Sequence, residues 1–496
     1  MTLIPLDIPA GFYRNGTDLE QAGRWRDGSL VRWRDNSLRP IGGWTDRKTS
    51  FCTNPIRGMH TWQSLNNTAY LAGGSHDQLV VMTGGGTLYD ITPTDLAAGR
   101  EDADVNTGYG GLFYGYGRYG QPRQETQASI PQNATTWSLD NWGEYLVACH
   151  YDDGRLLEWQ LGSSADAAPL ANAPTNNLGL VVTEERFIFA LGAGGNSRKV
   201  QWCDFEDNTL WAAATTNQAG SQELQTSGQI MQGIRTRGQT LIITDTDAHA
   251  ARYSGPPYIY SFSRVGTSCG AISRKAASDV DAGVFWMGQR GFFRFDGNSV
   301  SEVLCDVHDY VFNDFNAAQQ SKVWSVANGQ FGEIWWFYCS STSNEVDRYV
   351  AYDYKENHWL IGNLSRTSGV ERGVFRYPLF AGHDTDSDIY DHEVGYNFDS
   401  ETTFAETGPI TIGSGDRIAK VTNLITDENS QGDVNVTFKT RLYPNGTEST
   451  HGPFTPSNPT SVRFSGRQLR MRVEGQEPTQ WKVGTMRIDA TAGGNR

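Results

Sequence analysis

The chain has 496 residues, of which 38% are apolar and 12% aromatic, with 55 glycines and 18 prolines. This length is too great for one ordinary core and suits a large repeat architecture with a smaller domain, while the low proline content excludes a proline-rich disordered chain. The formal net charge is −15; residues 1–50 and 405–496 each carry +2, so residues 51–404 carry −19. An acidic body disfavours non-specific binding to nucleic acid.

The N-terminus, MTLIPLDIPAG, has neither a basic region nor an apolar core, so we expect no signal peptide. No apolar run approaches the ~18 residues that a membrane span needs, so we expect no membrane insertion. The cysteines are far apart and form no C-x-x-C, which predicts buried, reduced thiols in a protein assembled in the cytoplasm. They are Cys52, Cys149, Cys203, Cys269, Cys305 and Cys339.

Short apolar or alternating runs, bounded by Gly, Asn, Asp or Ser, dominate residues 51–404 and predict many short strands. The clearest helix candidate is 305–318. The predicted fold class is all-β: a β-propeller body of six or seven blades at 51–404 and a C-terminal antiparallel β-sandwich at 405–496. Residues 1–50 form an N-terminal segment that closes the propeller or contacts a neighbouring subunit.

A recurring turn supports the propeller. Strands end in an aromatic residue followed by Asp, whose side chain caps the turn while Asn or Gly takes the left-handed position. The turns lie at 88–90, 203–208, 294–298, 352–357 and 389–391, and two of them share D-[FY]-x-[DE]-N. They imply units of roughly 40–57 residues, as in four-stranded blades. The predicted blades lie near 57–93, 132–162, 176–213, 227–266, 273–316, 321–363 and 370–398.

The alternative to a propeller is a stack of unrelated sandwiches. If the propeller is closed, a strand from one terminus should join a blade begun by the other. We therefore expect residues 20–50 to pair near residues 370–400.

An insertion near 96–131 interrupts the repeats. Its core, GYGGLFYGYGRYGQP at 108–122, alternates glycine with aromatic residues. It is either a long surface loop stiffened by its rings or a segment that docks on a neighbouring subunit, because exposed aromatic side chains make good anchors. The candidate anchors are Tyr109, Phe113, Tyr114, Tyr116 and Tyr119.

After residue 405 the alternation becomes stronger, at 410–412, 434–441, 461–464, 468–473 and 482–488. Five or more strands in this length suit one antiparallel sandwich. Arg467, Arg470 and Arg472 lie at alternating or near-alternating positions and form either a solvated face or a contact face for an acidic partner.

Enzyme signatures are missing: there is no G-x-S-x-G, P-loop, H-E-x-x-H or Rossmann fingerprint. We therefore expect no enzyme, no hydrolase activity, no cofactor and no metal. The best ion-site candidate is HDTDSDIYDHE at 383–393, where Asp384, Asp386 and Asp388 alternate. Its sixth position is Ile389 rather than Gly, and no Glu stands at the twelfth, so a solvated loop is favoured. Because two distant carboxylates suffice for a glycosidase, an enzymatic propeller stays an alternative.

Several short motifs resemble one family. They are RNGT at 14–17, RWRDGSLVRW at 24–33, LRPIGGW at 38–44, PIRGMH at 55–60, WSLDNWGE at 137–144, GRQLRMRVE at 466–474 and WKVGTMR at 481–487. The pattern resembles the tail-hub, or nozzle, proteins of short-tailed bacteriophages, which are also called packaged-DNA stabilisation proteins. The most distinctive part is the x-R-P-x-G-G-W segment. The family has no catalytic site, so the resemblance transfers no functional residue.

The resemblance implies a propeller body in a ring, expected to be a homohexamer, in the virion tail below the portal and adaptor proteins. The ring would contact tail fibres or a tail needle, retain packaged DNA and pass double-stranded DNA without binding it specifically. Its lumen should be acidic or neutral, with basic residues at interfaces. The alternative function is a carbohydrate-binding or glycoside-hydrolase-like propeller, and a third is a propeller scaffold of the host. Besides the aromatic residues of the insertion, the candidate interface residues are Arg24, Trp25, Arg26, Arg32, Trp33, Arg467, Arg470 and Arg472.

Overall fold

The computed structural model describes residues 2–103, 132–162, 165–383, 387–412, 417–427, 433–476 and 478–494. This part of the chain is all-β, which confirms the predicted class. Its only helical segments are α1 (His308–Asn313) and the 3-10 turns η1 (Ala193–Gly195) and η2 (Ala317–Lys322). The helix expected over 305–318 is therefore shorter than predicted, because the chain after α1 turns aside: Phe315 bridges Ser340, and the Asn316 amide donates to the Cys339 carbonyl.

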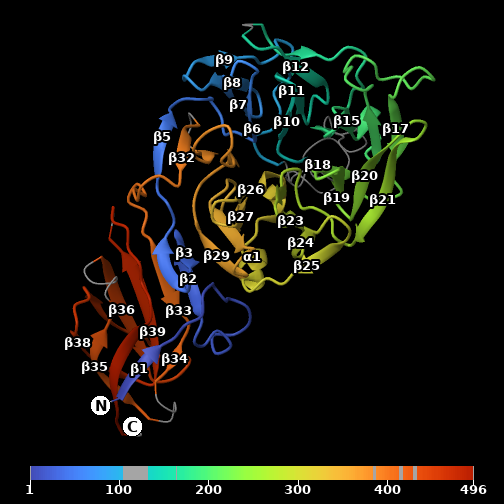
Figure 1. Ribbon diagram of the computed structural model, residues 1–496. Helices are drawn as coiled ribbons and strands as arrows, with labels where there is room; N and C mark the ends of the chain where they lie inside the picture. The colour runs from blue at the N-terminus through green and yellow to red at the C-terminus, as the bar shows by residue number, and fades with distance from the viewer. Residues whose placement is uncertain are drawn as a thin grey trace, which may run out of the picture.

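Seven four-stranded antiparallel sheets follow one another around a ring within the described residues (Figure 1). The first three are β6 (Gly58–Gln63), β7 (Ala69–Gly74), β8 (Leu79–Thr83), β9 (Leu88–Asp90); β10 (Trp137–Trp142), β11 (Tyr145–His150), β12 (Leu156–Trp159), β13 (Ala168–Pro169); and β14 (Gly179–Val182), β15 (Ile188–Leu191), β16 (Lys199–Trp202), β17 (Gly220–Glu223). The next three are β18 (Ile230–Thr236), β19 (Gln239–Thr244), β20 (Asp247–Gly255), β21 (Ile259–Thr267); β22 (Ala277–Val280), β23 (Gly283–Met287), β24 (Phe292–Phe295), β25 (Val300–Val303); and β26 (Trp324–Asn328), β27 (Glu333–Tyr338), β28 (Arg348–Asp353), β29 (His358–Asn363).

The seventh sheet closes the ring with a strand from the N-terminal segment. It contains β30 (Ser368–Val370), β31 (Leu379–Ala381) and β32 (Ile389–His392), and its fourth strand is β5 (Trp44–Lys48), which pairs antiparallel with β32. This is the contact expected between residues 20–50 and 370–400. The first strand of each sheet contacts the first strand of the next, and β30 contacts β6. The sheets therefore form a closed β-propeller.

The aromatic-Asp turns have the geometry that their sequence predicts. In the turn after β24, the Asp296 carboxylate accepts hydrogen bonds from the amides of Asn298 (2.9 Å) and Ser299 (2.8 Å), and Gly297 has φ 101°. Where neighbouring sheets cover both faces of a strand, that strand is largely apolar along its whole length. Every residue of β27, EIWWFY, is buried. Large rings let thin sheets bury enough apolar area to stay stable.

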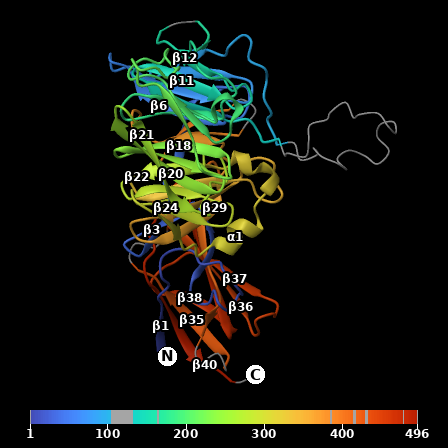
Figure 2. The same cartoon turned by 90° about the vertical axis from the view of Figure 1, so that its right-hand side faces the viewer.

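Two further antiparallel sheets lie beside the propeller (Figures 1 and 2). One has the order β1 (Thr2–Leu6), β40 (Met486–Ala492), β35 (Ala419–Ile425), β38 (Thr460–Gly466); the other has the order β2 (Trp25–Ser29), β33 (Phe404–Thr407), β39 (Gln468–Gly475), β36 (Val434–Arg441), β37 (Ser449–Phe454), with β34 (Ile410–Thr411) against β39. Phe438 of β36 contacts Phe464 of β38 across the two sheets, with ring centroids 5.0 Å apart. Because β1 and β2 belong to these sheets, this part of the protein is not made by residues 405–496 alone.

One continuous hydrophobic core joins the two parts. It contains Trp33 of the hairpin β3 (Val31–Arg34) and β4 (Ser37–Pro40), Trp335 and Tyr349 of the sixth sheet, and Met471 of β39. No helix among the described residues is long and apolar enough to cross a membrane.

The six cysteines are free thiols; five are buried and Cys305 is half-buried. Burial raises the pKa of Cys149 and of Cys203 to about 12, so the reactive thiolate form is scarce at neutral pH.

We expect native protein at pH 8 to react slowly with Ellman's reagent, and protein unfolded in guanidinium to release the colour of all six thiols. Buried thiols at high pKa are both inaccessible and protonated. Rapid labelling of two or more thiols in the folded protein would contradict this placement.

Candidate functional site

The segment with the most distinctive motif, LRPIGGW at 38–44, is the joint between the two parts of the protein. At its start, Leu38 exchanges backbone hydrogen bonds with Val483 of the C-terminal region, at 2.9 and 2.8 Å. At its end, the Trp44 amide donates to the Asn397 carbonyl (3.1 Å) and the Trp44 indole donates to Asp399 (2.5 Å). Trp44 then begins β5, the closing strand of the propeller. Seven residues thus connect the C-terminal sheets to the propeller.

A buried charge cluster lies beneath this joint. Arg32 of β3 is 2% exposed, and its guanidinium lies between Glu333, the first residue of β27, and Glu393, which follows β32. Arg32 Nη2 donates to Glu333 (3.0 Å), Nη1 donates to Glu393 (3.0 Å), and the guanidinium packs over the Phe331 ring at 3.7 Å. Burial lowers the pKa of Arg32, but the two carboxylates outweigh burial and raise it. Arg32 therefore stays charged and holds three segments together.

The two glycines of the motif are required by close packing against the segment after β32. The Gly42 amide donates to Glu393 (2.8 Å), and a Cβ at Gly42 would meet the Glu393 backbone. A Cβ at Gly43 would lie 2.6 Å from the Asn397 amide nitrogen, which is closer than real Cβ atoms approach. Glycine is thus the residue that lets the two backbones meet here.

A second motif, PIRGMH at 55–60, also holds an internal ion pair. The Arg57 side chain, 2% exposed, donates to Glu345 (2.8 Å), and the fully buried Lys322 lies 3.4 Å from the same carboxylate. Burial raises the pKa of Glu345, but the charges of Arg57 and Lys322 outweigh burial and lower it to about 2. This cluster connects the segment before β6 with the sixth sheet, across the closing point of the ring.

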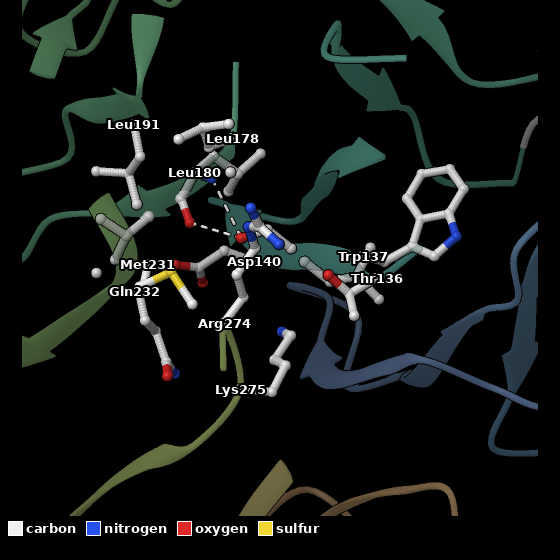
Figure 3. A pocket seen from close by; sticks show the side chains of 15 residues that line it. Thr136, Trp137, Asp140, Leu178, Leu180, Leu191, Met231, Gln232, Arg274 and Lys275 are labelled. Carbon is white, nitrogen blue, oxygen red and sulfur yellow. Dashed lines mark hydrogen bonds between the residues drawn. The ribbon is translucent and has the colours of Figure 1, made fainter. Parts of the chain in front are cut away.

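The centre of the propeller holds a small cavity of about 150 Å³ between β10, β14, β18 and the residues before β22 (Figure 3). Its polar side chains are those of Thr136, Ser138, Asp140, Gln232, Arg274 and Lys275. The Asp140 carboxylate accepts hydrogen bonds from the amides of Val182 (2.9 Å) and Asn141 (2.8 Å). Burial lowers the pKa of Lys275 to about 8, and the Asp140 charge opposes this shift.

Arg274 is the unusual residue of this cavity. It is 7% exposed, its guanidinium packs 3.6 Å over the Tyr151 ring, and its Nε and Nη2 have no hydrogen-bond partner. Together with Lys275 it gives the cavity two cationic side chains against one engaged carboxylate. The arrangement can hold a small anion by charge-assisted hydrogen bonds.

Several of the basic residues predicted to lie at interfaces form ion pairs within the chain. Arg26 and Arg470 both contact Asp18, at 2.5 and 2.6 Å. Arg472 lies 3.1 Å from Glu474, and its guanidinium packs over Phe404.

The remaining predicted interface residues differ in exposure. Arg24 lies 3.7 Å from Asp306, and Arg467 packs over the exposed Tyr443. Trp25, Trp33 and Arg32 are buried inside the chain and offer no exposed surface, because they fill the joint.

The predicted anchors Tyr109, Phe113, Tyr114, Tyr116 and Tyr119 lie outside the described residues, as do Asp384 and Asp386. In the rest of the acidic loop, Asp388 accepts a hydrogen bond from the Ser50 amide (2.8 Å), and Asp391 pairs with Arg47 (2.7 Å). These two carboxylates are thus engaged by protein donors.

Sequence reasoning missed Glu333, Glu345, Arg274 and Lys275. For Glu333 there was a signal, since this acid immediately precedes the apolar run IWWFY and so had to be buried with a partner. The partner, Arg32, is 301 positions away in the chain. Arg274 and Lys275 gave no signal beyond two adjacent basic residues.

No protein-family model matches the chain, and no curated protein matches it. Solved structures do. The virginiamycin B lyase of Staphylococcus aureus is 5% identical with a TM-score of 0.45, over 70% of this chain and 98% of the lyase chain. A streptogramin B lyase is 7% identical with a TM-score of 0.39, over 70% and 97%. YCF48 from Cyanidioschyzon merolae is 10% identical with a TM-score of 0.40, over 71% and 99%. Likeness at this level concerns the fold alone.

The expectation that this chain is not an enzyme is not retained: the similar solved structures include lyases, and a likeness of this kind shows the fold without deciding for or against catalysis. The physical reason is the architecture. A propeller brings together side chains from different blades, so a catalytic group can form without any local sequence motif. The absence of motifs is therefore no argument against catalysis.

We expect Gly43→Ala to lower the free energy of unfolding by about 1–3 kcal/mol, since the new methyl group must displace the Asn397 backbone. Urea denaturation measures the change. Gly373→Ala is the matched control, because Gly373 is exposed and has no atom within 4 Å of an added Cβ. Equal stability of Gly43→Ala and wild type would show that the joint is not tightly packed.

The Glu345 cluster predicts a pH dependence with a definite sign. The pKa of the Glu345 carboxyl falls from 4.5 in the unfolded chain to about 2 in the folded protein. Its contribution to the free energy of unfolding, roughly 3 kcal/mol, is therefore complete above pH 4.5 and is lost as the pH falls toward 2. The stability difference between wild type and Glu345→Gln should shrink over that range. The exposed Glu302→Gln serves as control; a constant difference for Glu345→Gln would refute the assignment.

Proposed function

We propose that this chain is the structural subunit of a ring-shaped tail hub, or nozzle, of a short-tailed bacteriophage. The ring is a hexamer that continues the DNA channel below the portal and adaptor proteins, retains packaged DNA, and contacts tail fibres or a tail needle. Residues 405–496, together with β1 and β2, form a β-sandwich that serves as the second rigid body of the subunit.

The observation that carries the proposal is the role of the motif segments. LRPIGGW joins the C-terminal sheets to the closing blade, and Arg32 of RWRDGSLVRW fills the charge cluster beneath it. Arg57 of PIRGMH forms the ion pair across the ring closure. Two of the segments that resemble the tail-hub proteins therefore join the two parts of the protein, and a third braces the ring closure of the propeller. A subunit that must hold a channel under internal pressure needs that rigidity.

The charge distribution supports the same function. Residues 51–404, which include the propeller, carry −19. Several basic side chains near the joint are neutralised by carboxylates of the same chain. A ring of such subunits presents few free cations to passing phosphates, so the DNA slides through without being trapped. Screening within ~8 Å at physiological salt keeps the repulsion short-ranged.

The native mass of the purified protein tests the proposal. We expect a species six times the mass of one chain by native mass spectrometry and mass photometry, and a ring with a mainly acidic or neutral lumen by cryo-electron microscopy. The measurement is repeated at high salt and over a range of protein concentrations, because subunit association depends on both.

Two outcomes would contradict this function. A monomer at all concentrations that binds or cleaves glycans would favour the carbohydrate-active propeller. Tight, salt-sensitive binding of free duplex DNA, or a lumen lined chiefly by Lys and Arg, would exclude the proposed passage of DNA.

A further inference from the structure

The turn between β28 and β29 brings three potential metal ligands together. Asp353 is the last residue of β28, His358 is the first residue of β29, and the two pair across the hairpin. Glu356 lies on the turn between them. One ligand atom from each residue lies within 4.8 Å of the others. The hairpin register thus places two carboxylates and an imidazole on one spot.

The turn itself is rigid. One oxygen of Asp353, Oδ1, accepts hydrogen bonds from the amides of Lys355 and Glu356, both at 2.8 Å. Asn357 adopts the left-handed conformation, with φ 57°, and its side chain accepts a hydrogen bond from the Tyr352 hydroxyl (2.7 Å). These contacts leave the second oxygen of Asp353 free to face His358.

His358 has a nitrogen without a partner. The residue is 4% exposed, and its buried Nε2 makes no hydrogen bond. This atom lies 4.0 Å from Asp353 Oδ2, which is too far for a hydrogen bond. An unsatisfied buried nitrogen costs about 1–3 kcal/mol, and a ligand between the two atoms would remove that cost.

His358 is closely packed by its neighbours. The Trp33 ring meets His358 edge-on with centroids 6.0 Å apart, and a Cβ at Gly11 would lie 2.5 Å from His358 Cβ. The next acid, Glu333, faces Asp353 across the β27–β28 ladder but is neutralised by Arg32. Glu356 is exposed, so the site opens to solvent through the turn. An ion can enter from that side.

A second turn has the same sequence pattern but lacks the histidine. Residues 204–209, DFEDNT, match residues 353–358, DYKENH, but Thr209 replaces the histidine. There the Asp207 carboxylate accepts hydrogen bonds from both the amide (2.9 Å) and the hydroxyl (2.6 Å) of Thr209. The corresponding acid in the other turn, Glu356, has no such partner in residue 358. The turn therefore needs no histidine to form.

We propose that Asp353, Glu356 and His358 bind one first-row divalent cation, such as Zn²⁺ or Mn²⁺, with water completing the coordination. Bonds of ~2.0–2.2 Å to imidazole nitrogen and carboxylate oxygen at a tetrahedral angle place the two ligand atoms about 3.5 Å apart, so His358 and Asp353, now 4.0 Å apart, must approach slightly. The exposed Glu356 side chain rotates to supply the third ligand. A nitrogen ligand favours these metals over Mg²⁺, which prefers oxygen. The bound ion fixes the β28–β29 turn at the edge of the sixth blade.

Calorimetry on the full-length protein tests this site after removal of metals with EDTA. We expect ZnCl₂ or MnCl₂ to bind with one ion per chain and raise the melting temperature, and MgCl₂ to have a much smaller effect. Glu356→Gln should weaken binding by at least about tenfold without unfolding the protein, because residue 356 is exposed. His358→Gln should abolish binding.

Two controls make the result specific. Asp207→Asn, in the matched turn, should leave the affinity unchanged. Co²⁺ added as a spectroscopic probe should give visible absorption bands that disappear in Glu356→Gln. Absence of 1:1 binding, or binding that survives in both Glu356→Gln and His358→Gln, would overturn the proposal.

Discussion

The architecture depends on one buried guanidinium. A charge that is 2% exposed is tolerated only when its partners are in place, and the partners of Arg32 come from two neighbouring blades of the propeller. Glu333 begins a central strand of the sixth sheet, and Glu393 follows the last strand of the seventh. Removing one partner from such a cluster typically costs 3–5 kcal/mol. The cluster therefore fixes the hairpin of β3 and β4 to the propeller, while the backbone hydrogen bonds between Leu38 and Val483 fix the same hairpin to the C-terminal region.

Ring closure imposes the second constraint. A propeller packs separate four-stranded sheets around a ring, and here the last sheet has only three strands from its own segment of the chain, so it needs a fourth from elsewhere. Here β5 supplies it, and β5 follows directly after the LRPIGGW joint. The same segment thus closes the propeller and fixes it to the second pair of sheets. A force on one part of the protein is therefore transmitted to the other through packed backbone rather than through a flexible linker.

Most of the basic side chains discussed above are paired with carboxylates of the same chain. The basic residues of the two terminal regions are largely used inside the chain: Arg26 and Arg470 converge on Asp18, and Arg32 is enclosed. At the centre of the propeller, two guanidinium nitrogens of Arg274 lack a hydrogen-bond partner, and Lys275 lies near the Asp140 charge. Among the described residues, these two cations line an enclosed cavity large enough for a small anion.

The sequence by itself determined the all-β class, the propeller and most blade boundaries, because these follow from short-range physics. Strand alternation, aromatic-Asp turns and glycine positions are all local patterns, and the turn at Asp296 forms as its sequence predicts. Even the pairing of the N-terminal segment with the last blade followed from the requirement for closure.

The tertiary structure alone decided which charges meet. Arg32 and Glu333 are 301 residues apart, and Arg57 and Glu345 are 288 apart. It also showed that the helix expected at 305–318 is shorter than predicted. Composition and periodicity record which face of a strand is buried, but the partner of a buried charge is chosen by the three-dimensional order of the sheets, and no local pattern carries that information.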